Sequence, residues 1–224
     1  MTETCSAMTK LWVSALLIVV VISGLTVFAY TSSNNALKES VRDGMKSTAA
    51  VMATQIDASD IAGINPGDEN SPRYIAVVKK LNAMRSLDDS IINAYILKVN
   101  PDQTATFLVD DLMLDDPAGS ARIGEVSTSP DKMEIFSALS VPTASKEPYT
   151  TKYGSFMSAY APIDDATENS TGNTYAVLAI DMSARDYNAA TSKGGLILVT
   201  GILSMLIALG TLLAFGLKSK SENE

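Results

Sequence analysis

Five side chains in the middle of the chain have types that suit the binding of a small polar molecule: Tyr95, Asp110, Ser158, Tyr160 and Asp181. The carboxylate of Asp181 can accept hydrogen bonds from a ligand ammonium group or another donor. The two tyrosines can supply apolar walls with polar tips. We predict a ligand-binding pocket built from these residues, with Asp110 as a secondary member.

The pocket prediction depends on strand parity, because alternate side chains of a strand face opposite sides of the sheet. Tyr95, Ser158, Tyr160 and Asp181 share one parity with small and hydroxyl-bearing neighbours in three expected strands. The opposite parity is apolar and includes Ala94, Ile96, Met157, Ala159, Leu178 and Ile180. We expect the apolar face to pack on a long helix and the mixed face to hold the pocket.

Each candidate residue also has a purely structural interpretation. The tyrosines would fill the core of the sheet, and Asp181 would cap a helix that starts at Ser183. Four carboxylates at 110–111 and 115–116 suggest calcium binding, but they lack the ligand spacing and the glycine of an EF-hand loop. We expect these four to lie in a solvated loop, and we predict no metal or other cofactor.

The composition excludes several kinds of chemistry. The chain has no histidine and a single cysteine, which rules out Ser-His-Asp and Cys-His catalytic pairs and cysteine-rich metal sites. Its 17 Lys and Arg against 25 Asp and Glu give a net charge of −8, which argues against nucleic-acid binding. No Gly-x-Ser-x-Gly nucleophile motif occurs. We therefore expect neither an enzyme nor a nucleic-acid-binding protein.

The helices that would support the pocket are predicted from periodicity and start signals. An apolar stripe over 37–56 predicts a long helix. Ser71 as N-cap and Pro72 at the first helical position predict a second helix, which should end before Asp88. Two further helices are expected, a short one at 131–139 and one that begins at Ser183.

The strands are predicted from period-two patterns rich in β-branched and aromatic residues. They lie at 91–99, 104–110, 149–153, 155–163 and 174–181. The first two should form a hairpin around the turn at Asn100-Pro101. Together, the elements predict an α+β fold with a long N-terminal helix and a mostly antiparallel sheet of about five strands.

Two uncharged and strongly apolar runs flank this domain, at 11–30 and 194–217. Each is long enough to cross a bilayer, because about 20 helical residues span a hydrocarbon core roughly 30 Å thick. The first run exceeds the apolar region of a typical secretory signal, so we interpret it as a retained anchor. We expect two transmembrane helices in a lipid bilayer, short tails at 1–10 and 218–224 on one side, and one globular domain at 31–193.

Three segments of the middle domain resemble the single Cache (PAS-like, extracytoplasmic) sensor domain family of two-span membrane receptors. They are INAYILKVNPDQTATFLVDD at 92–111, YGSFMSAYAPI at 153–163 and AVLAIDMSARDY at 176–187. In that family a hairpin, a G-x-x-x-S-x-Y-x-P-I strand and a final hydrophobic strand ending in Asp occur in this order. The Lys and Arg counts beside the spans are nearly balanced, so the extracytoplasmic placement of 31–193, with cytoplasmic tails, is implied by the resemblance alone.

The resemblance implies a sensor whose outside domain binds a small polar metabolite and passes its state through the flanking helices. Family members usually continue after the second span into a kinase, methyl-accepting or cyclic-dinucleotide domain, whereas this chain ends at Glu224. We therefore expect a signalling partner protein, and a homodimer is also considered. The alternative is a structural or assembly protein whose outside domain docks another protein. Asn169-Ser170-Thr171 fits the N-glycosylation pattern.

Overall fold

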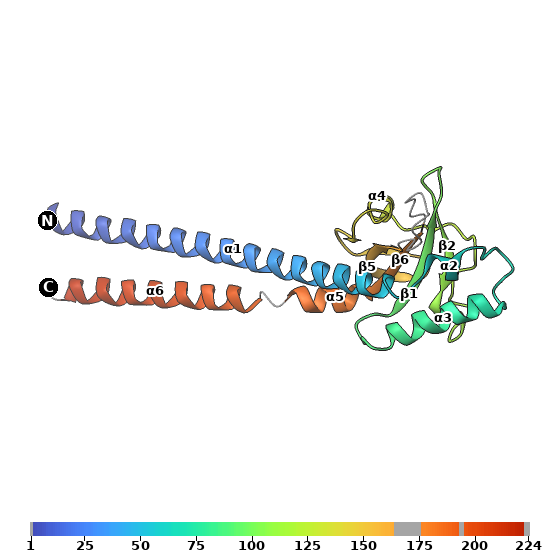
Figure 1. Cartoon of the computed structure of the whole chain (residues 1–224). Helices are drawn as coiled ribbons and strands as arrows, with labels where there is room; N and C mark the ends of the chain where they lie inside the picture. Colours follow the sequence, from blue (N-terminus) through green and yellow to red (C-terminus); the bar gives the residue numbers. More distant parts are fainter. Residues whose placement is uncertain (1, 164–175, 193–194, 222–224) are drawn as a thin grey trace. The chain divides into compact units, whose positions relative to one another are not determined.

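The computed structural model describes residues 2–163, 176–192 and 195–221 (Figure 1). Contacts divide the chain into two compact units, one of 1–38 with 191–224 and one of 39–190. The glycosylation pattern at Asn169 and the first residues of the expected strand 174–181 lie outside the described residues.

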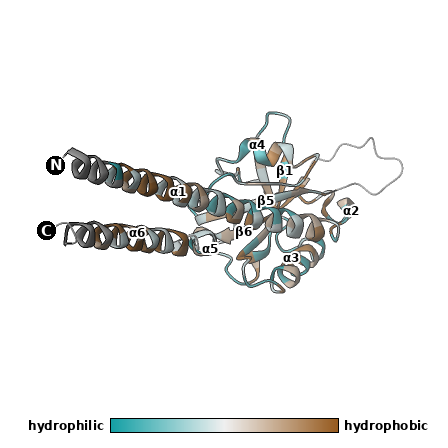
Figure 2. Cartoon of the chain, turned by 90° about the vertical axis from the view of Figure 1, so that its left-hand side faces the viewer, coloured by the Kyte–Doolittle hydropathy of each residue, from teal (hydrophilic) through white to brown (hydrophobic). Residues whose placement is uncertain are grey.

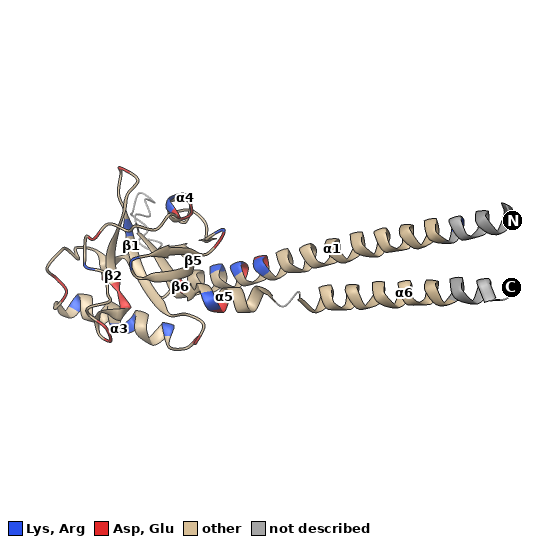
Figure 3. Ribbon diagram, turned by 180° about the vertical axis from the view of Figure 1, so that it is seen from behind, with Lys and Arg blue, Asp and Glu red and all other residues tan. Residues whose placement is uncertain are grey.

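The first unit contains the two apolar runs, and both are helical as expected. They belong to α1 (Thr2–Ala53) and α6 (Gly195–Ser221). By length and composition both helices could cross a membrane. The described residues of these runs are mostly apolar (Figure 2), and most of their large apolar side chains are exposed. No Lys, Arg, Asp or Glu lies between Lys10 and Lys38 or between Gly195 and Lys218 (Figure 3).

The second unit begins with the last turns of α1, followed by α2 (Ala58–Ile61) and α3 (Pro72–Arg85). The apolar stripe buries Met45, Ala49 and Met52, which confirms the predicted long helix. The helix ends at Ala53, before the last residue of the stripe. The start of α3 is as predicted, because Pro72 is its first residue and the Ser71 hydroxyl accepts a hydrogen bond from the Tyr74 backbone N–H at 3.2 Å.

Among the described residues, six strands of the second unit form one antiparallel sheet in the order β2-β1-β6-β5-β3, with β4 paired to β5. The predicted α+β class is confirmed. The sequence did not predict β3, because this strand has two residues and is too short to show a period of two. The strands are β1 (Asn93–Val99), β2 (Ala105–Asp110), β3 (Thr143–Ala144), β4 (Tyr149–Thr151), β5 (Gly154–Pro162) and β6 (Ala176–Ser183), and η1 (Asp111–Met113), α4 (Lys132–Ser137) and α5 (Ala184–Thr191) complete the unit.

The two faces of the sheet have different environments, as strand parity predicts. The apolar face shares one buried cluster with α1 and α3; its sheet residues include Ala94, Ile96, Met157, Ala159, Leu178 and Ile180. The other face forms a smaller cluster with Ile135 and Ala138, which belong to α4 and its end. Because α4 covers only part of the mixed face, the rest is available for a cavity.

Candidate functional site

Cross-strand register places the predicted residues in two adjacent rows on the mixed face. In one row Asp181 of β6 lies between Asn93 of β1 and Ser158 of β5. In the other, Ala179 lies between Tyr95 and Tyr160, and Tyr95 is paired in turn with Asp110 of β2. Directly opposite residues on one face lie within contact distance. The sheet therefore brings all five predicted residues together.

A cavity of about 650 Å³ opens over these rows. Three of the predicted residues, Tyr95, Asp110 and Asp181, line it. The remaining walls come from Asn93, from aromatic residues of β2, β4 and β5, and from the loop between η1 and α4. Its volume falls within the range of roughly 300–1,000 Å³ that is usual for small-molecule sites.

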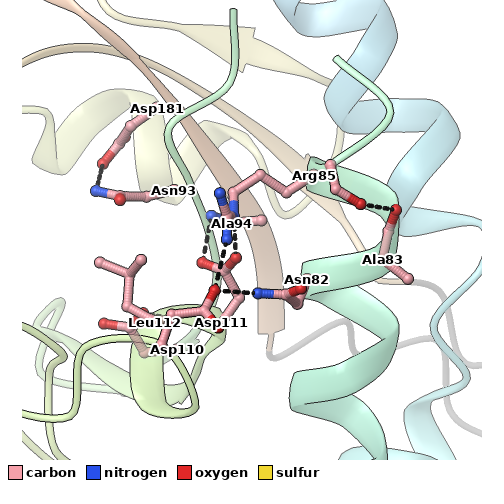
Figure 4. Close-up of polar contacts among 11 residues, drawn as sticks. Asn82, Ala83, Arg85, Asn93, Ala94, Asp110, Asp111, Leu112 and Asp181 are labelled. Atoms are coloured by element: carbon pink, nitrogen blue, oxygen red, sulfur yellow. Dashed lines mark hydrogen bonds and ion pairs between the residues drawn. The ribbon is translucent and has the colours of Figure 1, made fainter. Parts of the chain in front are cut away.

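Asp181 lies at the base of the cavity and is 3% exposed. Its Oδ1 accepts hydrogen bonds from the Ser158 hydroxyl and, at 3.2 Å, from the Tyr95 hydroxyl. Its Oδ2 accepts a longer bond of 3.4 Å from the side-chain amide of Asn93 (Figure 4). Burial raises the pKa of Asp181 to about 7, because these neutral donors only partly replace the lost hydration.

Asp110 is a second buried carboxyl in the cavity wall. Its oxygens accept the backbone N–H groups of Ala121 at 2.7 Å and Leu112 at 3.0 Å, so it holds the loop above the cavity. Burial raises the pKa of Asp110 to about 6, although both hydrogen bonds favour the charged form. Asp110 thus combines a structural role with a position in the wall.

Ser158 and Tyr160 lie beneath the cavity and do not line it. Both are completely buried. The Ser158 hydroxyl supports Asp181, while the Tyr160 hydroxyl donates to Asp131 at 3.1 Å and lies 3.3 Å from the Tyr149 hydroxyl. We assign these two residues to the hydrogen-bonded floor that positions Asp181 and Tyr149. The core-filling interpretation is correct for Tyr160.

The capping interpretation of Asp181 is wrong. Ser183 itself precedes α5, and its hydroxyl accepts the backbone N–H of Asp186 at 3.1 Å and donates to the Asp186 carboxylate at 2.6 Å. The first of these bonds makes Ser183 the N-cap of α5, and the second joins the two side chains. Asp181 lies two residues earlier, still within β6, where its side chain faces the cavity.

The expectation that all four acidic residues of 110–116 are solvated is also wrong. Asp111 is completely buried and forms an ion pair with Arg85 of α3, and its other oxygen accepts the backbone N–H of Ala94 at 2.9 Å (Figure 4). Asp115 is exposed and contacts the same arginine at 3.1 Å. The sequence pattern did not reveal that Arg85, on a helix earlier in the chain, pairs with Asp111 and Asp115. Among the described residues, no group of three acidic or cysteine side chains could hold a metal ion.

The sequence prediction missed the aromatic walls of the cavity. Phe107, Tyr149, Tyr153 and Phe156 all line it, and the rings of Tyr95 and Phe107 form a tilted contact with centroids 5.3 Å apart. Simple alternation from Asp110 places Phe107 on the opposite face, and a register shift between Ile96 and Leu97 brings both residues to the mixed face, so parity could not have found Phe107. The sequence could not predict that Arg122 and Glu125 line the cavity, because they lie in a loop and loops have no periodic pattern.

No family model and no curated protein matches the chain. Among solved structures, the periplasmic domain of RsbU from Chlamydia trachomatis is similar over 84% of this chain and 59% of that one, with 12% identity and a TM-score of 0.48. The extracellular domain of the histidine kinase mmHK1S-Z2 is similar over 72% of this chain and 60% of that one, with 11% identity and a TM-score of 0.39. The chain therefore spans about three fifths of each of these structures.

Proposed function

We propose that this chain is a membrane-anchored sensor whose domain, 31–193, lies outside the cytoplasm and binds a small polar molecule. The observation that carries the proposal is the cavity of about 650 Å³ with a buried carboxyl, Asp181, at its base. A buried carboxyl facing an open space is costly for the fold alone. Its presence is better explained by a ligand that uses it.

Two connections support the transmission of a binding signal to the flanking helices. The strand that carries Asp181 runs directly into α5. On the other side, the backbone N–H of Ser158 donates to the Ser145 hydroxyl at 3.0 Å, and the Ser145 carbonyl accepts the Arg42 side chain of α1 at 2.9 Å. A ligand that shifts the floor of the cavity would therefore act on both helices. A signalling partner protein, or a second copy of the chain, would receive the change.

The docking alternative has one observation in its favour. On α4 and after it, Met133, Phe136 and Val141 are 76%, 49% and 58% exposed. Exposed apolar side chains that lie close together are typical of protein interfaces. A docking protein would use this surface and leave the cavity without a ligand.

We expect ligands to stabilise the full chain, reconstituted in lipid nanodiscs, against thermal unfolding. A compound at about 100 times its dissociation constant adds roughly 2.7 kcal/mol of stability. Asp181→Ala should weaken such a compound roughly ten- to hundredfold by removing a charge-assisted hydrogen bond. Asp60→Ala, which removes an exposed carboxylate of α2, is the matched control and should bind normally. A broad metabolite screen in which nothing shifts the unfolding midpoint would favour docking.

The proposed topology places 31–193 outside the cytoplasm and both tails inside. Protease added to intact cells should then cut within 31–193 and leave a tag at residue 224 intact. Permeabilised cells should lose the tag as well, which is the control for protease access. Protection of the domain in intact cells would reverse the topology.

A further inference from the structure

We infer that the cavity takes an organic cation, a protonated amine or a quaternary ammonium group, and that Asp181 releases a proton when this cation binds. The inference rests on the proposed function, because it names the class of ligand for the same cavity. Four features carry it: the charges of the lining residues, the free acceptor capacity of Asp181, the aromatic walls, and the fact that no Lys or Arg of the described residues is paired with Asp181.

The charged groups of the cavity wall favour a positive ligand. Acidic side chains come from Asp110, Asp116, Glu125 and Asp181, and basic ones only from Arg122 and Lys152. Lys152 is already paired with Glu125 at 2.8 Å. Arg122 is an exposed loop residue. This leaves an excess of carboxylates, and two of them, Asp110 and Asp181, are buried.

Asp181 retains the capacity to accept a hydrogen bond from a ligand. Among the described residues, its Oδ1 has two donors, Ser158 and Tyr95, and its Oδ2 has one, Asn93 at 3.4 Å. A carboxylate can accept about four hydrogen bonds. Because Asp181 lines the cavity, a ligand N–H can reach this carboxyl.

The aromatic residues around the carboxyl suit a cation better than an anion. Tyr95, Phe107, Tyr149, Tyr153 and Phe156 line the cavity. The negative face of an aromatic ring attracts an ammonium group. The same faces repel a carboxylate or a phosphate. An arrangement of aromatic rings beside a buried carboxyl is therefore complementary to an amine.

Without a cation, the environment of Asp181 favours its protonated form. The titratable or charged groups that face it are Tyr95 of β1, Asp110 of β2, Tyr149 of β4 and Tyr160 of β5, and Asp131 lies behind Tyr160. In the described part of the chain, no Lys or Arg is hydrogen-bonded or ion-paired with Asp181. Burial, together with the charge of Asp110, raises its pKa to about 7. Burial and nearby acids also raise the pKa values of Tyr95 and Tyr160, so these hydroxyls stay neutral.

The binding step conserves charge and protons. The protonated carboxyl loses its O–H proton to the solvent, and the resulting carboxylate pairs with the ammonium group of the ligand. One proton is thus released for each cation bound at pH values below about 7. Such a sensor would report amine concentration and external pH together.

The test uses two series of compounds with matched shape on the full chain in nanodiscs: propylammonium, 1-propanol and propionate, and benzylammonium, benzyl alcohol and benzoate. Binding is followed by saturation-transfer NMR and calorimetry. We expect the ammonium compounds to bind and their apparent affinity to rise roughly fifty-fold from pH 5 to pH 7, as expected for a site with a pKa of about 7. Calorimetry in buffers of different ionisation enthalpy should show close to one proton released at pH 6.

Two variants test whether ammonium binding depends on the charge of Asp181 and on that of Arg122. Asp181→Asn keeps a carbonyl for Ser158 and Tyr95 but removes the charge, so at pH 7 it should weaken the ammonium compounds at least tenfold, and it should leave only the smaller pH dependence that Asp110 contributes. Arg122→Gln removes a positive charge from the cavity wall and should not weaken their binding, whereas Asp60→Ala on α2, outside the cavity, should leave it unchanged. Tight binding of propionate or benzoate, lost in Arg122→Gln, would overturn the cation inference but leave the sensor proposal in place. Binding of no compound of either series would overturn the inference. If the wider metabolite screen also finds none, the sensor proposal fails as well.

Discussion

Replacing Arg85 with methionine is expected to lower the free energy of unfolding of the domain by about 3–5 kcal/mol, because it leaves a buried carboxylate without a partner. Asp111 is completely buried, and Arg85 neutralises it from α3. Methionine keeps most of the apolar stem of arginine, so the loss of packing is small. Among the described residues, Asp111 then keeps one hydrogen bond, from the backbone N–H of Ala94.

Pulse proteolysis in urea on the full chain in nanodiscs measures this change. The control is Lys80→Met on the same helix, whose ion pair with Asp60 is 3.7 Å long and about 40% exposed on both sides; it should cost less than about 1 kcal/mol. The effect of Arg85→Met should decrease at pH 5, because burial raises the pKa of Asp111 and the unpaired carboxyl can take up a proton. Equal losses in the two variants would show that the buried pair does not stabilise the domain.

The fold class was predictable because its signals are local. The stripe that buries Met45, Ala49 and Met52 repeats at helical spacing, and the Ser71-Pro72 start signal acts within one turn. Alternate side chains of the strands face opposite sides of the sheet, and the apolar character of one side predicted that it packs on the helices. The two-residue β3 and the early end of α1 have no such signal, since tertiary contacts decide them.

The candidate site was predictable only as far as strand parity extends. Parity selected Tyr95 and Asp181 correctly as residues of one face, and it also selected Ser158 and Tyr160, which face the same side but lie under other groups. Whether a side chain of this face reaches the cavity depends on which other groups cover it. Tyr160 packs in one cluster with residues of α4, and no local sequence pattern encodes this contact. The pairing of Asp111 with Arg85 is hidden for the same reason, because it joins two elements far apart in the sequence.

The stability of the wild-type domain is expected to fall relative to that of Asp181→Asn as the pH rises from 4 to 8. Asp181 ionises near its ordinary pKa of about 4 in the unfolded chain and at about 7 in the folded domain. Between these values the folded state holds one more proton than the unfolded state, so the free energy of unfolding decreases by about 1.4 kcal/mol per pH unit. Above pH 7 both states are ionised and the decrease ends.

The change accumulated over this window is on the order of 4 kcal/mol, and the 3% exposure of Asp181 leaves little screening by water. Asp110 also titrates within the window, with a pKa of about 6, but it is present in both proteins and its contribution largely cancels in the difference. Urea denaturation of the two chains at half-unit pH intervals provides the curves. Parallel curves would mean that Asp181 is already ionised in the folded domain near pH 4. In that case the cavity would hold a permanent negative charge, and a cation could bind without releasing a proton.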